Sequence, residues 1–318
     1  RVEQSRNFAN KVWNASRFIL MNMDGKNVTK PEASELMPAD QWILSACNTL
    51  VKDVTENLDK FELGIALSKV YDFVWDEFCD WYIEIAKYRM YHAEEDPKGA
   101  NAALWTLREV LKTSLKLLHP YIPFVTEEIY SKLVPEEESL MMSAWPVYDE
   151  AASFPEAEDV LNHYKEIVRG VRNVRAEMNV PNSRKATIYV ECENAKLSQG
   201  LMSLKDSVKL MAAANDFVIQ TDKTGIADDA VSIVVPDATV YLPMEELIDF
   251  AQEIERLAKE ETRLQKEIAR ANGMLNNEKF VSKAPEAKVQ EEREKLEKYQ
   301  QMLAQVQERL AGLKEKCK

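Results

Sequence analysis

The chain has 318 residues, a net charge of −13 and a hydrophobic content of 46%, enough apolar material for more than one buried core. Such an acidic composition excludes a protein that coats nucleic acid by bulk electrostatics, so an acidic partner must meet local basic patches. Only 8 Gly are present, which favours helices over a glycine-rich phosphate-binding or β-rich fold. The four Cys residues form no C-x-x-C pair, and we expect reduced thiols in a cytoplasmic protein.

The negative charge is concentrated in the first three quarters of the chain. Residues 245–318 hold 15 Lys and Arg against 16 Asp and Glu, whereas residues 1–244 hold 26 against 38. No apolar run approaches the ~20 residues that span a bilayer, so we expect no membrane partner. The chain begins at Arg1 rather than at an initiator Met, which suggests a fragment of a longer protein.

Helical periodicity predicts an α-helical bundle over residues 1–150. The third of its helices is apolar and aromatic over much of its surface, as is typical of a central helix that is covered on several sides. Gly and Pro residues separate the helices at the expected positions. The predicted helices cover residues 1–24, 39–60, 62–92, 99–118 and 126–133.

A different pattern follows a predicted linker at residues 136–155. Residues 151–243 alternate between helical and β-branched segments, which predicts a small α/β module. Pro236-Asp237 is the expected turn between the last two strands. The predicted elements are helices at 157–178 and 201–213 and strands at 186–190, 217–220, 231–235 and 239–242.

Residues 244–318 carry two heptad stripes. Positions that alternate by three and four residues are apolar from Leu247 to Leu275 and from Val289 to Leu313, apart from Glu261 and Glu292. A repeat of 3.5 residues specifies helices that wind around a partner. The stripes match in length and have a short connection, so we predict an antiparallel two-helix coiled-coil arm. The predicted fold class is therefore mainly α, with a bundle, a small α/β module and this arm.

No motif of an active site is present. The sequence lacks G-x-x-x-x-G-K-[ST], G-x-G-x-x-G, H-E-x-x-H and G-x-S-x-G, which mark phosphate, dinucleotide, zinc and nucleophile sites. Carboxylates are plentiful, but we expect runs such as Glu136–Glu138 to be solvated. We expect no catalytic residue, no metal ligand and no cofactor in this chain.

Four segments resemble the valyl-tRNA synthetases of bacterial type, which are class I aminoacyl-tRNA synthetases. Residues 7–18 (NFANKVWNASRF) and 119–130 (HPYIPFVTEEIY) resemble their anticodon-binding bundle. Residues 175–181 (RAEMNVP) resemble the module that follows the bundle, and residues 277–285 (NEKFVSKAP) resemble the tip of their C-terminal arm. The resemblance covers essentially the whole chain, and the first two segments are shared with isoleucyl and leucyl relatives.

The resemblance implies a ligase that attaches valine to tRNA with ATP and Mg²⁺. The H-I-G-H and K-M-S-K-S motifs and the editing domain of the family are absent, so the ligase activity cannot reside in this chain alone. The implied partner is a valine-accepting tRNA, not DNA, and the implied state is a cytoplasmic monomer. Two alternatives stay open: the same region of an isoleucyl or leucyl enzyme, and a bundle and coiled-coil scaffold for protein interactions.

Recognition of an anticodon requires exposed hydrogen-bond donors and stacking rings, because RNA loops present splayed bases. Asn10, Asn14 and Arg17 follow one another at i, i+4 and i+7 on the first helix, which predicts a polar stripe opposite its apolar face. Lys26 and Lys30 follow in the next loop. We predict that these five residues face the anticodon.

Other interpretations of this helix are possible. Asn10 and Asn14 could instead join helices through hydrogen bonds. We assign the rings of Trp13 and Phe18 to the core rather than to base stacking.

Basic residues of the α/β module are candidates for contacts with the tRNA backbone. Lys165, Arg169 and Arg172 share one face of the helix at 157–178, and Arg184 and Lys185 follow the next turn. The alternative is an ordinary solvated helix face.

The arm carries positive charge along its first helix and at its tip. The resemblance implies that it contacts the outer corner of tRNA, where the D and T loops meet. The aromatic ring at the tip could stack on exposed bases or fold back over the seam. The candidate residues are Arg263, Lys266, Arg270, Lys279, Phe280 and Lys283.

Overall fold

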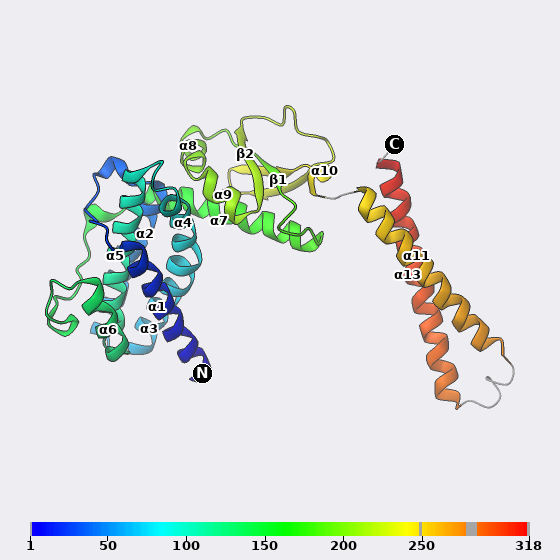
Figure 1. Cartoon of the computed structure of the whole chain (residues 1–318), viewed down its shortest axis with the longest axis horizontal. Coiled ribbons are helices and arrows are strands. Elements are labelled where there is room, and N and C mark those ends of the chain that lie inside the picture. The colour runs from blue at the N-terminus through cyan, green and yellow to red at the C-terminus, as the bar shows by residue number, and fades with distance from the viewer. Residues whose placement is uncertain (1, 248–249, 278–284, 317–318) are drawn as a thin grey trace. The chain divides into compact units, whose positions relative to one another are not determined.

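The computed structural model describes residues 2–247, 250–277 and 285–316. The described chain is mainly helical, with one sheet of four strands, as the sequence predicts. It forms two compact units, Arg1–Pro243 and Met244–Lys318. Figure 1 shows the first unit as a cluster of helices continuous with the sheet, and the second as a pair of long helices.

Each of the five helices expected in the bundle is present. The core between them is formed by large side chains, among which Phe78, Leu107 and Leu115 have no exposed surface. The bundle consists of α1 (Val2–Met23), α2 (Pro38–Asp59), α3 (Leu63–Asp72), η2 (Phe73–Tyr82), α4 (Ile83–Tyr91), α5 (Pro97–Leu118) and α6 (Pro123–Leu133), with a short 3-10 turn, η1 (Ala33–Glu35), before α2.

The expected helix at 62–92 is continuous but not uniform. It begins as α3 and ends as α4, and η2 between them is a π-helix. The wider turn of a π-helix changes the direction in which successive side chains point. Phe73, Phe78 and Tyr82 of η2 are all buried. The sequence could not show this change, because η2 is apolar on several sides and so gives no clear period.

A buried ion pair joins α2 to α4. Arg89 is 8% exposed and Asp40 is fully buried, and Arg89 Nη1 donates to both carboxylate oxygens of Asp40 at 2.8 and 2.7 Å. The Tyr82 hydroxyl donates to Asp40 Oδ1 at 2.7 Å. Charges so far from water stay ionised only with such partners, so this group fixes how α2, η2 and α4 meet.

The segment expected as a linker runs along α2 and is bound to it. Asn48 Nδ2 donates to the carbonyl of Asp149 at 2.7 Å, and the amide of Asp149 donates back to Asn48 Oδ1 at 2.9 Å. Trp145 Nε1 donates to Thr55 Oγ1 at 2.9 Å. Two 3-10 turns, η3 (Leu140–Met142) and η4 (Glu150–Ala152), give the segment its shape.

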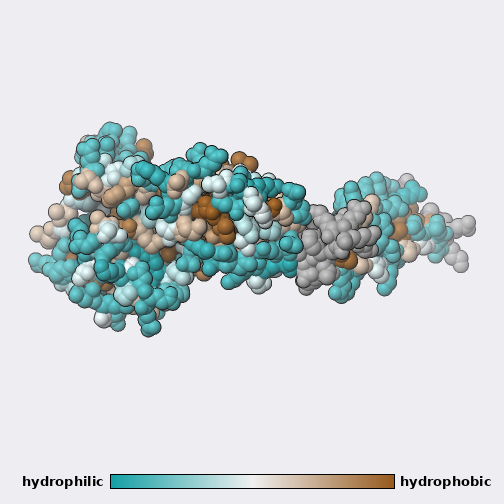
Figure 2. Space-filling view, turned by 90° about the horizontal axis from the view of Figure 1, so that it is seen from above, coloured by the Kyte–Doolittle hydropathy of each residue, from teal (hydrophilic) through white to brown (hydrophobic). Residues whose placement is uncertain are grey.

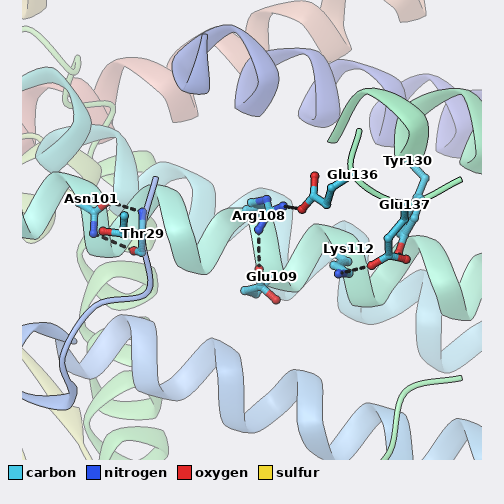
Figure 3. Close-up of polar contacts among 8 residues, drawn as sticks. All are labelled: Thr29, Asn101, Arg108, Glu109, Lys112, Tyr130, Glu136 and Glu137. Carbon is cyan, nitrogen blue, oxygen red and sulfur yellow. Dashed lines mark hydrogen bonds and ion pairs between the residues drawn. The ribbon is translucent and has the colours of Figure 1, made fainter. Parts of the chain in front are cut away.

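The acidic run at 136–138 is not merely solvated, which corrects the sequence prediction. Arg108 Nη2 donates to Glu136 Oε1 at 2.6 Å, and Lys112 Nζ donates to Glu137 Oε1 at 2.9 Å. The Tyr130 hydroxyl donates to Glu137 Oε2 at 2.7 Å. Figure 3 shows how these side chains bind the loop after α6 to α5. The prediction failed because the basic partners lie on a neighbouring helix and cannot be inferred from the local sequence of the acidic run.

The α/β module contains a mixed sheet in the order β2-β1-β4-β3. β1 and β2 are parallel and the other pairs are antiparallel. The expected helix at 201–213 is instead two helices, α8 and α9, which are separated at Leu204. The elements are α7 (Pro155–Glu177), β1 (Ala186–Glu191), α8 (Ala195–Ser203), α9 (Lys205–Met211), β2 (Ala214–Gln220), β3 (Val231–Val235) and β4 (Ala238–Leu242).

α7 lies against the sheet and also against the bundle. A Cβ at Gly170 would come within 2.8 Å of Ile233 Cγ2 on β3, so glycine allows the helix to approach the strand closely. The same helix packs along α2. α7 is therefore shared by the bundle and the module.

The second unit contains the predicted antiparallel pair. After a short turn, α10 (Met244–Leu247), it consists of α11 (Phe250–Leu275) and α13 (Glu286–Lys316). Leu257, Leu264 and Ala271 of the first heptad stripe are buried. Glu261, the polar exception in that stripe, accepts a hydrogen bond from Gln307 Nε2 at 2.8 Å across the seam.

Within the described residues, no helix combines the length and apolar content that crossing a lipid bilayer requires.

Replacing Asp40 by Asn should destabilise the first unit strongly. The substitution leaves the Arg89 guanidinium buried without an ionised partner, and the expected loss is about 3–5 kcal/mol in the free energy of unfolding. Urea unfolding followed by tryptophan fluorescence measures it. Asp53→Asn is the matched control, since it breaks the half-exposed pair with Lys69 and should cost no more than about 1 kcal/mol. Equal unfolding midpoints for the two variants would refute this role for Asp40.

The Glu137 pair should make stability depend on pH. Hydrogen bonds from Lys112 and Tyr130 lower the pKa of Glu137 below its ordinary value of 4.5. A carboxylate with a lowered pKa stabilises the fold above its ordinary pKa, and this contribution is lost as the pH falls through the folded-state pKa. The stability advantage of the wild type over Glu137→Gln should therefore shrink between roughly pH 5 and pH 3.

Thermal unfolding of both proteins across this pH range gives the comparison. Glu138→Gln, at the exposed neighbouring position, serves as the control and should differ little from the wild type. An advantage of the wild type over Glu137→Gln that stays constant with pH would count against the pair.

Candidate nucleic-acid interface

α1 presents a polar face to solvent because its apolar residues are confined to the other side. Phe8, Val12 and Ile19 are buried, at spacings that bring them to one face of a helix. The exposed face follows the spacing i, i+3, i+4, i+7 and i+11. Its residues are Asn10, Trp13, Asn14, Arg17 and Met21.

Trp13 lies on this exposed face, and its assignment to the core is wrong. The residue is 42% exposed, and the Nζ of Lys132 lies 5.9 Å from the centre of its ring. The sequence contained the signal, since Trp13 stands three residues after Asn10 and four before Arg17. Phe18 is half-buried, with Lys87 Nζ 5.5 Å from its ring centre.

Asn10 and Asn14 do not join α1 to another helix. Among the residues that the structure describes, neither side chain makes a hydrogen bond across to a neighbouring element. Asn10, Asn14 and Arg17 are exposed on the same helix face as Trp13. This combination of donors and an aromatic surface suits splayed RNA bases.

The loop after α1 holds Lys26 and Lys30 in exposed positions. Gly25, with φ of +70°, ends the helix. The loop is fixed at Thr29, whose amide donates to Asn101 Oδ1 at 3.0 Å while Asn101 Nδ2 donates to the carbonyl of Thr29 at 2.9 Å. Figure 3 shows this reciprocal pair. The sequence did not predict this role for Asn101, because only the folded structure brings the loop next to the first turns of α5.

Lys165 is not on a solvent-facing surface, which corrects the predicted face of α7. The residue is 7% exposed, its Nζ donates to Glu77 Oε2 at 2.9 Å, and it lies 4.8 Å from the ring centre of Trp42. The prediction failed because this face of α7 packs on the bundle. In this position Lys165 supports the fold and is not available to a phosphate.

Arg169 and Arg172 are exposed, and both lie over the ring of Trp81, at 5.4 and 6.0 Å from its centre. They line a groove of about 960 Å³ that is also lined by carboxylates. Burial and the neighbouring carboxylates raise the pKa of Asp76 in this groove. We call it the acidic groove, after Asp76, Glu77, Asp80 and Glu84.

The turn that contains Arg184 and Lys185 is shaped by a buried arginine. Arg175 Nη2 donates to the carbonyls of Pro181 at 2.8 Å and Arg184 at 2.6 Å. Arg184 is half-buried, and Lys185 is exposed. The structure thus separates Arg184 and Lys185 from the acidic groove, although the sequence grouped them with Arg169.

Part of the positive charge predicted along the arm is compensated within α11. Arg263 donates twice to Glu260, at 2.9 and 2.6 Å, which raises the pKa of Arg263. Arg270 lies 3.6 Å from a carboxylate oxygen of Glu267, and Lys266 is exposed. Lys279, Phe280 and Lys283 lie outside the described residues.

Two features of the described residues bear on metal and thiol chemistry. No group of three or more His, Cys, Asp and Glu side chains among them is placed to hold a metal ion. Cys47 and Cys79 are buried, and burial raises the pKa of each thiol to about 12, so neither is a ready nucleophile. Figure 2 shows that the visible face is mostly hydrophilic, with small hydrophobic patches, as suits a polar partner.

Two family models match the chain. One, described as the anticodon-binding domain of tRNA ligase, matches residues 40–190. The other, described as the valyl tRNA synthetase tRNA binding arm, matches residues 249–314. The first match begins after α1, so the polar face of α1 lies outside it.

Valine–tRNA ligases are similar to this chain along almost its whole length. The ligase of Clostridium perfringens is 48% identical over 98% of the chain, which spans 35% of that relative. The ligase of Clostridium acetobutylicum is 48% identical over 99% of the chain, and that of Bacillus subtilis is 40% identical over 99%. The chain thus spans about a third of the length of these relatives, in their C-terminal region. Together with the arm, these matches show that the chain belongs to the valine–tRNA ligase family, of which it carries the anticodon-binding domain and the tRNA-binding arm.

Proposed function

We propose that this chain supplies the tRNA-binding part of a ligase that attaches valine to tRNA with ATP. The observation that carries the proposal is the presence in one chain of two separate matches to tRNA-binding modules, at 40–190 and 249–314. ATP and the Mg²⁺ that would offset its phosphate charge belong, on this proposal, to the part of the relatives that this chain does not span. The partner is a valine-accepting tRNA, bound in the cytoplasm by a single copy of the protein.

The exposed face of α1 is the proposed anticodon contact. The indole ring of Trp13 offers a base-stacking surface, and Asn10, Asn14 and Arg17 surround it with donors and acceptors for base edges. Lys26 and Lys30 stand in the loop that Asn101 fixes, where they can meet neighbouring phosphates. This arrangement binds by stacking and short hydrogen bonds, which suits a chain whose net charge is −13.

The arm is proposed to contact the outer corner of the tRNA. α11 has 26 residues, so it is ~39 Å long. Its apolar seam is occupied by α13 in the same chain, as the cross-helix bond between Gln307 and Glu261 shows. A seam that is filled internally offers no apolar stripe to a second copy or to a scaffold partner, which favours RNA binding by a monomer.

Trp13→Ala should weaken tRNA binding. Loss of one base stack on an aromatic ring costs roughly 1–3 kcal/mol, equivalent to about a 5- to 150-fold loss of affinity. Filter binding with a valine tRNA and with an anticodon-altered tRNA measures it, and the variant should also discriminate less between the two. Tyr91→Ala removes another exposed aromatic ring of the bundle and should leave both affinities unchanged. Equal behaviour of the two variants would argue against α1.

Removing the cations of α11 should weaken binding through phosphate contacts. Arg263→Gln, Lys266→Gln and Arg270→Gln combined should lower the slope of log affinity against log salt by up to about three. The matched control replaces three exposed cations of α13, Lys288, Arg293 and Lys298, with Gln. Equal losses for the two triple variants would mean that α11 is not the contacting helix.

A further inference from the structure

A second groove of the first unit differs in charge from the rest of the protein. It has a volume of about 530 Å³ and lies where the end of α7, the turn before β1 and the end of α9 meet. Its charged lining residues are Arg172, Arg175, Lys185 and Lys209. Within the described part of the chain, no Asp or Glu lines this groove, although residues 1–244 hold 38 Asp and Glu against 26 Lys and Arg. We call it the basic groove.

The sheet register brings these residues together. β1 and β2 run parallel, and Ala186 pairs with Ala214, so Lys185 and Ala213 stand side by side just before the paired strands. Ala213 has φ of +52°, a conformation that non-glycine residues rarely adopt. This turn ends α9 directly at β2 and places Lys209, one helical turn earlier, on the wall opposite α7.

Arg175 gives the groove a positive charge that no carboxylate among the described residues is seen to pair with. It is 4% exposed, and its Nε has no hydrogen-bond partner in the described structure. Its Nη2 donates only to carbonyl oxygens, those of Pro181 and Arg184. Burial lowers the pKa of Arg175. A cation withdrawn from water without a carboxylate is costly, and an anion in the adjoining groove would relieve that cost.

The other cations are held at the groove in usable positions. Arg172 Nε donates to the carbonyl of Met211 at 2.8 Å, which fixes the guanidinium plane at the rim. Lys185 is exposed. Lys209 Nζ lies 3.6 Å from a carboxylate oxygen of Asp206, in a partly exposed ion pair on α9, so a phosphate in the groove competes with Asp206 for its ammonium. The nearby Asp216 is already paired with Lys205 at 2.7 Å.

We propose that the basic groove binds phosphates of the tRNA backbone, with Lys185 and Lys209 as direct contacts and Arg172 as a positioned donor. The inference rests on the proposed function and adds a site to it. It also divides the basic residues that the sequence grouped together. Lys165 is buried in the fold, and Arg169 lines the acidic groove but not the basic groove, whereas Arg172 lines both.

The test compares two double variants of the whole chain that remove the same charge from the same module. Lys185→Gln combined with Lys209→Gln removes both cations that are proposed to contact phosphates directly. Arg169→Gln with Lys196→Gln is the matched control, because Arg169 faces the acidic groove and Lys196 pairs with Glu156 on the surface. Circular dichroism and thermal unfolding confirm that both variants fold as the wild type does.

Binding of labelled valine tRNA is measured by anisotropy between 50 and 300 mM KCl. The groove variant should lose roughly tenfold in affinity at 100 mM, and its salt slope should fall by about two, while the control keeps both. The loss should be equal for an anticodon-altered tRNA, since phosphates carry no sequence. An unchanged slope in the groove variant, an equal loss in the control or a loss confined to one anticodon would each overturn the inference and leave the proposed function standing. Failure of the wild type to bind tRNA at 50 mM would overturn both.

Discussion

The carboxylate of Asp40 organises the bundle, since Arg89 and Tyr82 both donate to it inside the core. Three buried polar groups from α2, η2 and α4 must meet there, and any other packing of these helices would leave a charge without its partner. The Lys165–Glu77 pair extends the same constraint to α7. Because α7 also packs on the sheet, the position of the α/β module follows from these two ion pairs. The basic groove at the end of α7 therefore depends on polar contacts made deep in the bundle.

The fold could be predicted from the sequence wherever apolar residues recur at regular spacing on one face of an element. The five bundle helices, the strands and both arm helices follow from such periods, and even the heptad exception at Glu261 has a partner across the seam. The hydrophobic period does not indicate the buried face where an element is covered on more than one side. η2 is apolar on several sides, so the sequence does not indicate its π-helical geometry. α7 is packed on two sides, so the prediction that Lys165 faces solvent was wrong.

The candidate site was less predictable than the fold because exposure is a property of the neighbours. Spacing alone placed Asn10, Asn14 and Arg17 on one face of α1, where the structure shows them exposed. The same spacing includes Trp13, but the usual burial of tryptophan outweighed it. Arg175 and Lys209 have no sequence signal, since the groove that they line exists only once β1 and β2 pair in parallel. The role of each residue in binding tRNA stays a prediction.

The distribution of charge is compatible with the proposed binding of a polyanion by an acidic chain. Several carboxylates of the first unit form ion pairs with neighbouring cations, as Glu136 does with Arg108 and Glu137 with Lys112. Charges act over ~8 Å at physiological salt, and at that distance the two opposite charges of such a pair nearly cancel. On the proposed function, an approaching RNA meets exposed cations that form no ion pair within the described residues, among them Lys26, Lys30 and Lys185. On the same proposal, the acidic surface repels RNA elsewhere, so the net charge that excludes indiscriminate binding also favours the proposed contact positions.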